Sequence, residues 1–121
     1  MSKGLTLVIG ASENSSRYSN MAVHRLLAHG YPVAALGSRP GKIADTIIQT
    51  GHPEFSEVDT ITLYVGPERL AFMHDYILSL KPNRVIFNPG TEDEAFFLRL
   101  RESGIEAVEA CTLVMLSTGQ F

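Results

Sequence analysis

The stretch LTLVIGASENSSR, residues 5–17, decides the fold that we expect for this chain. Its first five residues predict a buried strand, and Gly10 then begins a polar loop. A helical pattern follows over about residues 19–29. A strand, a glycine turn and a helix near the N-terminus are typical of α/β domains that bind nucleotides, because the free N–H groups at the helix start favour a phosphate.

The loop itself leaves two interpretations open. Only the first glycine of the dinucleotide fingerprint G-x-G-x-x-G is present, and Asn14 stands where that loop needs a small residue. Against this, Ser12 and Arg17 supply a hydroxyl group and a cation at the place where a phosphate would lie. We therefore predict that Gly10, Ala11, Ser12 and Arg17 contact a ligand, and the alternative is a plain structural turn.

Length and composition limit what the chain can do. Its 121 residues suffice for one domain over residues 1–121, with 45% hydrophobic and 19% charged residues, as in ordinary globular proteins. A net charge of −3 without a basic run argues against a nucleic-acid partner, and no apolar run reaches the roughly 18 residues that cross a bilayer. No signal peptide opens the chain, and the single cysteine, Cys111, fits a reducing compartment, so we expect a cytoplasmic protein without a membrane partner.

The rest of the chain alternates predicted strands and helices. Four further strands are expected, over residues 33–36, 59–65, 84–87 and 106–109. Helices are expected over about 67–80 and from a capping box at Thr91 to about 103, and an apolar tail over 112–116 packs on the core. These elements predict a single Rossmann-like α/β domain, with a five-stranded parallel sheet of order 3-2-1-4-5 and helices on both faces.

Residues 43–57 do not follow this alternation. The segment is β-branched at its start, lacks a clean helical stripe and is broken by Gly51, His52 and Pro53. It predicts an extended segment and a loop with one helical turn near 54–57, so the usual crossover helix is missing or very short.

The expected strand order decides where a ligand would bind. In an open α/β sheet the ligand lies at the carboxyl ends of the strands, at the switch in strand order. For the order 3-2-1-4-5 this switch lies between the first and fourth strands, so Gly10-Ala11-Ser12 should lie beside Asn88-Pro89-Gly90. Ser38-Arg39 and Val65-Gly66-Pro67 should follow along the same edge.

The turn after the second strand carries Ser38, Arg39 and Lys42. An NAD-type site has an Asp or Glu near this point, which binds the ribose hydroxyl groups. Two cations and a hydroxyl group instead suit a phosphate on the ribose, as in NADP or in the 3′-phospho-ADP part of coenzyme A. A solvated surface turn with two ordinary basic residues is the alternative.

Four short motifs carry a resemblance to a known family. They are Gly10-Ala11-Ser12 with Arg17, Val65-Gly66-Pro67, Asn88-Pro89-Gly90 and Glu109-Ala110-Cys111-Thr112. In this set, over residues 5 to about 116, the chain resembles the small stand-alone CoA-binding-domain proteins, the succinyl-CoA-synthetase-like CoA-binding family. The resemblance implies a domain that binds coenzyme A or an acyl-CoA as its small-molecule partner.

The resemblance also implies roles for individual residues. Pro40-Gly41-Lys42 resembles a stretch that helps hold the CoA phosphates in the α subunit of succinyl-CoA synthetase, so Lys42 would pair with a phosphate more strongly than Arg39. Ser12 with Arg17 would line the first loop, and Val65-Gly66-Pro67 would border the adenosine or pantetheine arm. That subunit has a second domain with a phosphorylated histidine, which this chain is too short to contain, so the resemblance implies binding rather than ligation.

The residues themselves predict no catalytic site and no metal site. No pair among the four histidines has metal-ligand spacing on one face, and no Ser-His-Asp arrangement can be argued. Cys111 is expected to be a small buried residue rather than a reactive thiol. We therefore expect a non-enzymatic binding protein. The alternatives are an NADP-binding oxidoreductase or cofactor sensor, and a protein-interaction module that uses the sheet edge or the Phe96-Phe97 region.

Overall fold

The structure, a computed structural model, describes residues 3–121. Seven strands form one sheet in the order β3-β4-β2-β1-β5-β6-β7, and every neighbouring pair is parallel except β3 and β4. The strands are β1 (Leu5–Ile9), β2 (Val33–Leu36), β3 (Gly41–Ile43), β4 (Thr46–Gln49), β5 (Val58–Leu63), β6 (Arg84–Phe87) and β7 (Glu106–Glu109). The helices are α1 (Tyr18–Ala28), α2 (Pro67–Leu70), the 3-10 helix η1 (Ala71–Met73), α3 (His74–Ser79), α4 (Glu94–Glu102) and α5 (Thr112–Ser117).

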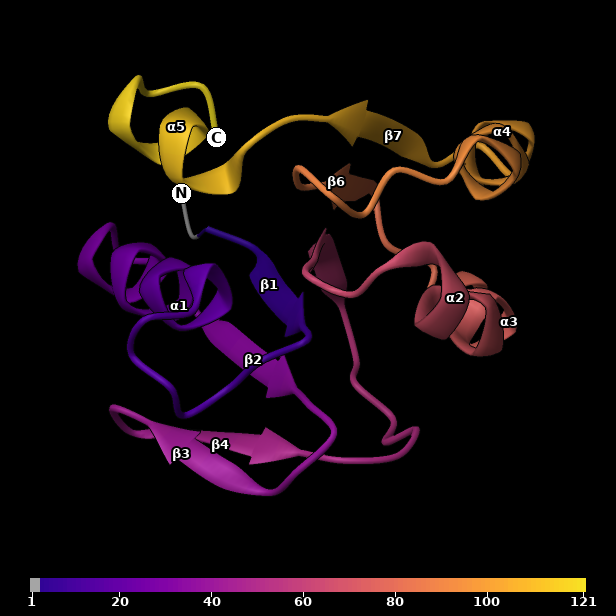
Figure 1. Cartoon of the computed structure of the whole chain (residues 1–121). Coiled ribbons are helices and arrows are strands. Elements are labelled where there is room, and N and C mark those ends of the chain that lie inside the picture. The colour runs from indigo at the N-terminus through magenta and orange to yellow at the C-terminus, as the bar shows by residue number, and fades with distance from the viewer. Residues whose placement is uncertain (1–2) are drawn as a thin grey trace.

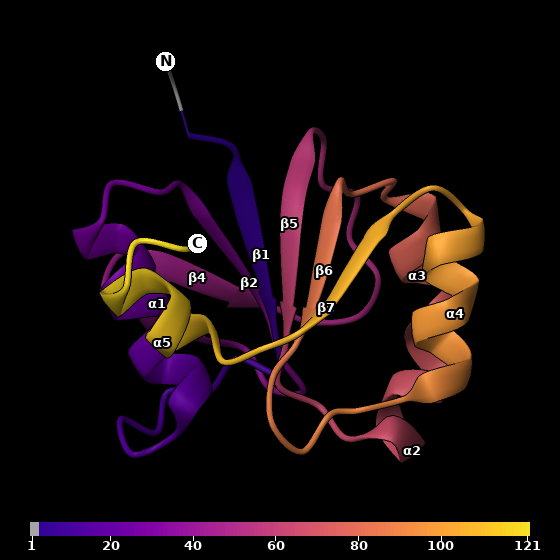
Figure 2. The same cartoon turned by 90° about the horizontal axis from the view of Figure 1, so that it is seen from above.

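Helices cover both faces of the sheet, as predicted. α1 and α5 lie against one face, and α2, α3 and α4 lie against the other (Figures 1 and 2). Side chains alternate along β1, so Leu7 and Ile9 pack with α2, α3 and α4, whereas Val8 packs with α1 and α5. This explains why the central strands are apolar on both faces. No helix within residues 3–121 is long and apolar enough to span a bilayer.

The sheet has seven strands rather than the five that the sequence predicts. The five expected parallel strands are present as β1, β2, β5, β6 and β7, close to their predicted bounds. The difference lies between β2 and β5, where β3 and β4 form an antiparallel hairpin with Lys42 opposite Ile47, and β4 adds to β2 in parallel. The extended segment and the missing crossover helix are confirmed, whereas the helical turn expected near 54–57 is wrong.

The predicted order 3-2-1-4-5 is also wrong, and the hairpin is the reason. β4 occupies the edge of β2 that the sequence assigns to the next long strand. β5 therefore pairs with β1, with Ile9 opposite Leu63, and β6 pairs with β5. The switch in strand order thus lies between β1 and β5. The loop that begins at Tyr64 follows directly beside Gly10-Ala11-Ser12, and Asn88-Pro89-Gly90 lies one strand further away than predicted.

Asn88 is buried at the end of β6 and has a structural role. Its Nδ2 donates to Thr62 Oγ1 (2.7 Å) and to the backbone oxygen of Leu63 (2.8 Å). Its Oδ1 accepts from the backbone N–H of Thr112 (2.9 Å). One side-chain amide therefore joins β5, β6 and the first residue of α5.

α4 begins later than the predicted capping box at Thr91. Asp93 is the N-cap, and its Oδ1 accepts from the backbone N–H of Phe96 (3.1 Å). The Thr91 hydroxyl group instead donates to the backbone oxygen of Asn88 (2.8 Å), because the chain still turns at this point. The capping function that the sequence predicts is thus present, but a different residue provides it.

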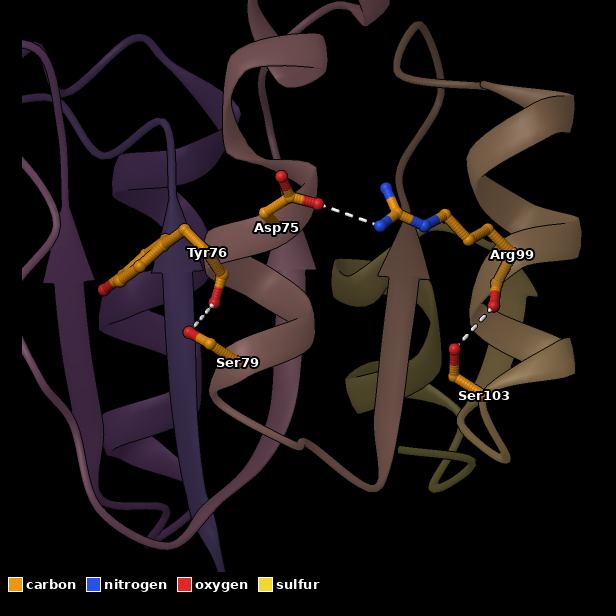
Figure 3. A network of polar contacts seen from close by, with 5 residues as sticks. All are labelled: Asp75, Tyr76, Ser79, Arg99 and Ser103. Atoms are coloured by element: carbon orange, nitrogen blue, oxygen red, sulfur yellow. Dashed lines mark hydrogen bonds and ion pairs between the residues drawn. The ribbon is translucent and has the colours of Figure 1, made fainter.

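The helix expected over 67–80 is divided into α2, η1 and α3. Leu70 in α2 and Ile77 in α3 are both fully buried and anchor the two ends of this segment. An ion pair between Asp75 and Arg99 (2.8 Å) ties α3 to α4 at the surface (Figure 3). Phe96 in α4 is fully buried against the core, whereas Phe97 is partly buried, so only the second of these two rings is accessible at the surface.

Candidate ligand-binding site

Two adjoining pockets open at the carboxyl edge of the sheet, at the switch between β1 and β5. Gly10, Ser38, Val65 and Arg69 line both of them, so the pockets share a border. The apolar pocket has a volume of about 310 Å³, and its other walls include Ile9, Leu36, His52, Phe72 and Met73. The polar pocket has a volume of about 510 Å³, and its other walls include Ser12, Glu13, Asn14, Arg17, Arg39 and Tyr64.

Two glycines let the strand ends come this close together. Gly10 has a φ of +94°, and a Cβ at this position would lie 2.8 Å from the backbone oxygen of Tyr64. A Cβ on Gly37 would lie 2.5 Å from the backbone oxygen of Ala11. Glycine at these two positions therefore allows the loops after β1, β2 and β5 to pack backbone against backbone beneath the pockets.

Polar side chains within the β1–α1 loop fix its shape. Asn20 Nδ2 donates to the backbone oxygen of Ser12 (2.9 Å), and the hydroxyl group of Ser12 accepts from the backbone N–H of Asn14 (3.1 Å). Glu13 Oε2 accepts from the backbone N–H of Lys42 (3.0 Å), which ties the loop to β3. No side chain caps the start of α1, and its N-cap residue, Arg17, lies on the wall of the polar pocket.

Three arginines give the polar pocket its charge. Arg17, Arg39 and Arg69 all line it, and each comes from the loop or helix that follows a different strand. Within residues 3–121, no carboxylate lies within 4.0 Å of any of these three guanidinium groups. Glu13 is the acidic residue on these walls, and its carboxylate already accepts the hydrogen bond described above. Guanidinium groups in this arrangement suit phosphate oxygens.

The structure brings seven of the predicted site residues together. They are Gly10, Ala11, Ser12, Arg17, Ser38, Arg39 and Val65, all of which line one or both pockets. The predicted residues that do not line either pocket are Lys42, Gly66, Pro67, Asn88, Pro89 and Gly90. The ligand contacts assigned to this second group stay predictions.

Lys42 is one of the predicted site residues that lie outside both pockets. It belongs to β3, its side chain is 60% exposed, and its ammonium group lies 4.0 Å from Asp45 Oδ1. Its backbone N–H supports the β1–α1 loop through Glu13, but its side chain does not line the polar pocket. The hairpin moves Lys42 away from the turn after β2, where the sequence places it.

Sequence reasoning missed several residues of the pocket walls, and Arg69, Phe72 and His52 are the ones that matter most for the chemistry of the site. A signal existed for Arg69, because it lies in the first turn of a helix that follows a parallel strand, at the edge where ligands bind. No comparable signal marked Phe72 or His52, since an exposed phenylalanine in a helical pattern resembles ordinary packing. The position of His52 depends on the unpredicted path after β4.

Tyr64 forms part of the wall of the polar pocket, but its hydroxyl group is buried. Burial raises the pKa of Tyr64 to about 12, against smaller opposing effects from the nearby hydroxyl groups of Thr112 and Thr62. The phenol therefore stays protonated and neutral over the physiological range. Tyr64 is a wall of the site rather than a general base.

The described residues 3–121 contain no group of three or more His, Cys, Asp or Glu that could hold a metal ion. Cys111, the residue before α5, is a free thiol of intermediate exposure and is not part of either pocket wall. The site is thus built from glycines, hydroxyl groups, guanidinium groups and apolar side chains. Such a set can bind an anionic ligand that also has an apolar part.

Comparison with known proteins gives one family match. A family described as CoA binding domain matches residues 5–117 of this chain. No curated protein is similar enough in sequence to count as a match.

Several solved structures share the fold. The crystal structure of an uncharacterized protein is 45% identical, covers 100% of both chains and has a TM-score of 0.96. The structure of cell-free ID.343 from Thermus thermophilus is 22% identical, with a TM-score of 0.87, and the match covers 98% of this chain and 91% of that one. A dinucleotide forming acetyl-coenzyme A synthetase 1 from Ca. Korarchaeum cryptofilum, in complex with phosphate and ADP, is 16% identical with a TM-score of 0.71. That match covers 90% of this chain and 26% of the synthetase.

Proposed function

Since this chain belongs to the CoA binding domain family, we propose that it binds coenzyme A or an acyl-CoA in the two adjoining pockets. Coenzyme A carries a pyrophosphate and a 3′-phosphate on one adenosine, and guanidinium groups are well suited to these anions. The observation that carries the proposal is the convergence of Arg17, Arg39 and Arg69 on one pocket, with no ion-pair partner within residues 3–121.

The position of each arginine suggests the phosphate that it contacts. Arg17 lies at the uncapped start of α1, where the helix dipole adds to its charge, so we assign it to the pyrophosphate. Arg39 follows β2 together with Ser38, so we assign these two residues to the 3′-phosphate. Arg69 lies on the border of both pockets, and we assign it to the pyrophosphate together with Arg17.

We further propose that the chain binds its ligand without carrying out a reaction. Two features support this: the Tyr64 phenol stays neutral, and Cys111 lies away from both pockets. We also propose a cytoplasmic location, where a single free cysteine stays reduced.

Isothermal titration calorimetry with coenzyme A, acetyl-CoA, NADP and NAD tests the proposal. We expect binding of coenzyme A and acetyl-CoA with similar affinity, and weaker binding of NADP and NAD. A lack of both binding heat and thermal stabilisation with millimolar coenzyme A would contradict the proposed function.

A second candidate function is binding of NADP, as an oxidoreductase or cofactor sensor. The pairing of Ser38 with Arg39 at the end of β2 favours it, since a ribose 2′-phosphate would meet the same hydroxyl group and cation. Tighter binding of NADP than of coenzyme A, with hydride transfer to a carbonyl compound, would reverse the ranking.

A further inference from the structure

Phe72 is the most exposed of the large hydrophobic residues described, with 84% of its surface accessible. Single exposed apolar residues are common on protein surfaces and need no explanation by themselves. Phe72, however, lies on the wall of the apolar pocket together with Met73 and Arg69. An aromatic ring on the wall of a pocket offers a stacking surface to a planar ligand.

The backbone holds Phe72 in this position. It lies in η1, between α2 and α3, whose residues Leu70 and Ile77 are fully buried in the core. The tighter winding of a 3-10 turn changes the direction in which its side chains leave the helix. Phe72 therefore projects outward from a segment that is anchored on both sides.

A second planar ring lies on another wall of the same pocket. The His52 imidazole stacks on the Tyr76 ring, with ring centroids 4.5 Å apart and planes 11° apart. The Tyr76 hydroxyl group donates to the backbone oxygen of Pro53 (2.7 Å), so α3 also holds the loop that carries His52. Figure 3 shows the Tyr76 ring extending from α3 away from Arg99.

The two pockets differ in the chemistry that they offer. The apolar pocket has aromatic and aliphatic walls and one guanidinium group, Arg69, which it shares with the polar pocket. A flat, uncharged heteroaromatic ring suits such walls, whereas phosphates suit the polar pocket. Stacking of a base on an aromatic side chain needs no particular hydrogen-bond pattern.

We propose that the adenine ring of the bound nucleotide stacks on Phe72 in the apolar pocket, with its ribose at the shared border and its phosphates in the polar pocket. The inference rests on the proposed function and adds an orientation to it. With the adenine in the apolar pocket, the pantetheine arm leaves through the polar pocket toward solvent. The protein then recognises the nucleotide end of any CoA thioester and does not discriminate between acyl groups.

The chain contains no tryptophan, so Phe72→Trp places a single tryptophan, which can be excited selectively at about 295 nm, at the proposed stacking position. We expect coenzyme A and adenosine 3′,5′-bisphosphate, which lacks the pantetheine arm, to quench its fluorescence to a similar final level. 4′-Phosphopantetheine, which lacks the base, should leave the fluorescence unchanged. The matched control is Tyr18→Trp, at a residue of α1 that is 68% exposed and outside both pockets, and it should show no response.

Removal of the ring gives an independent measurement. Phe72→Ala should weaken binding of coenzyme A roughly 5- to 150-fold, the range for loss of one base–aromatic stack, while Phe72→Tyr should bind like the unmodified protein. Thermal unfolding of each variant checks that the fold is unchanged, which we expect because the side chain is exposed. Acetyl-CoA and hexanoyl-CoA should bind with equal affinity.

The outcomes separate this inference from the proposed function. If the unmodified protein binds coenzyme A, but the Phe72→Trp fluorescence does not respond and Phe72→Ala binds with unchanged affinity, the stacking inference is overturned and the proposed function stands. A strong dependence of affinity on acyl length would overturn the orientation. If the unmodified protein binds no form of coenzyme A, both proposals fail.

Discussion

Two loops at the same edge of the sheet use polar residues in opposite ways. The β1–α1 loop (residues 10–17) and the β6–α4 loop (residues 88–93) each follow a parallel strand. In the first loop, hydrogen bonds within the loop fix the backbone, and Arg17 is left facing a pocket. In the second loop, Asn88 makes three hydrogen bonds inside the protein, and Asp93 caps α4 and lies 3.3 Å from His74.

The difference shows that a position at the carboxyl edge does not by itself make a binding loop. The β6–α4 loop carries acids at the start of a helix, where they satisfy the helix dipole and repel an anion. The β1–α1 loop precedes a helix whose start has no acidic residue and no side-chain cap. The β1–α1 loop therefore differs from the β6–α4 loop in that its positive charge has no acidic partner among residues 3–121 and is available to an anionic ligand.

The largest effect, a loss of stability, should come from a substitution in the β6–α4 loop. Asn88→Ala removes three buried hydrogen bonds and leaves the Thr112 N–H and the Thr62 hydroxyl group short of partners, so we expect a loss of about 2–3 kcal/mol in the free energy of unfolding. Urea denaturation measures this loss. The protein that remains folded should bind coenzyme A normally. Asn14→Ala, in the exposed β1–α1 loop, is the control and should cost less than about 0.5 kcal/mol.

Arg69→Ala should give the next largest effect, on binding rather than on folding. Loss of a guanidinium group that contacts the pyrophosphate should weaken coenzyme A binding by about 1.5–3 kcal/mol, the range for hydrogen bonds to charged groups. Titration calorimetry provides the measurement, and Arg25→Ala, at an exposed residue of α1 outside both pockets, serves as the control. Equal losses in the two variants would show that only overall charge matters.

Arg39→Ala should cost about 1–2 kcal/mol of coenzyme A affinity, and the cost should depend on the 3′-phosphate. Dephospho-CoA, which lacks that phosphate, should bind the unmodified protein less well than coenzyme A. It should bind the Arg39→Ala variant with little further loss, because the same interaction has been removed twice. Full additivity of the two losses would place the 3′-phosphate elsewhere.

Lys42→Ala should give the smallest effect, below about 0.5 kcal/mol on both binding and stability, because the side chain is exposed and lies outside the pockets. The sequence alone predicts the reverse ranking, with a loss of about 1–3 kcal/mol for Lys42 and less for Arg39. A direct comparison of the two variants by calorimetry therefore decides between the structural and the sequence-based assignment.

Four of the five parallel strands could be predicted because each is a short run rich in apolar and β-branched residues bounded by a glycine, proline or polar turn, and β7 could be predicted because it follows the glycine that ends a helix. The β3–β4 hairpin could not, since its two-residue turn is Ala44-Asp45, and Ala44 adopts a φ of +52°. Turns of this kind normally contain Asn or Gly, so the sequence carries no hairpin signal. The error in strand order followed from this one turn.

The site was predictable to the extent that it depends on single strand ends. Gly10, Ser12 and Arg17 follow β1, and Ser38 with Arg39 follows β2, so neither set requires knowledge of the strand order. Arg69 and Phe72 belong to the site because β5 lies beside β1. This pairing depends on the tertiary structure and could not be predicted from local sequence patterns. The predicted contact of Asn88 with the first loop failed for the same reason.

The pairing of β1 with β5 also decides when the site can come into existence during folding. The β3–β4 hairpin closes over two residues, and such hairpins form within about 1–10 μs. β1 pairs with β5 across all of α1, β2 and the hairpin, so this pairing is non-local and carries a larger cost of loop closure. Because both pockets take walls from the loops after these two strands, a nucleotide can bind only after that pairing has formed. A ligand that contacts both loops therefore stabilises the folded chain, and we expect it to slow unfolding rather than to speed folding.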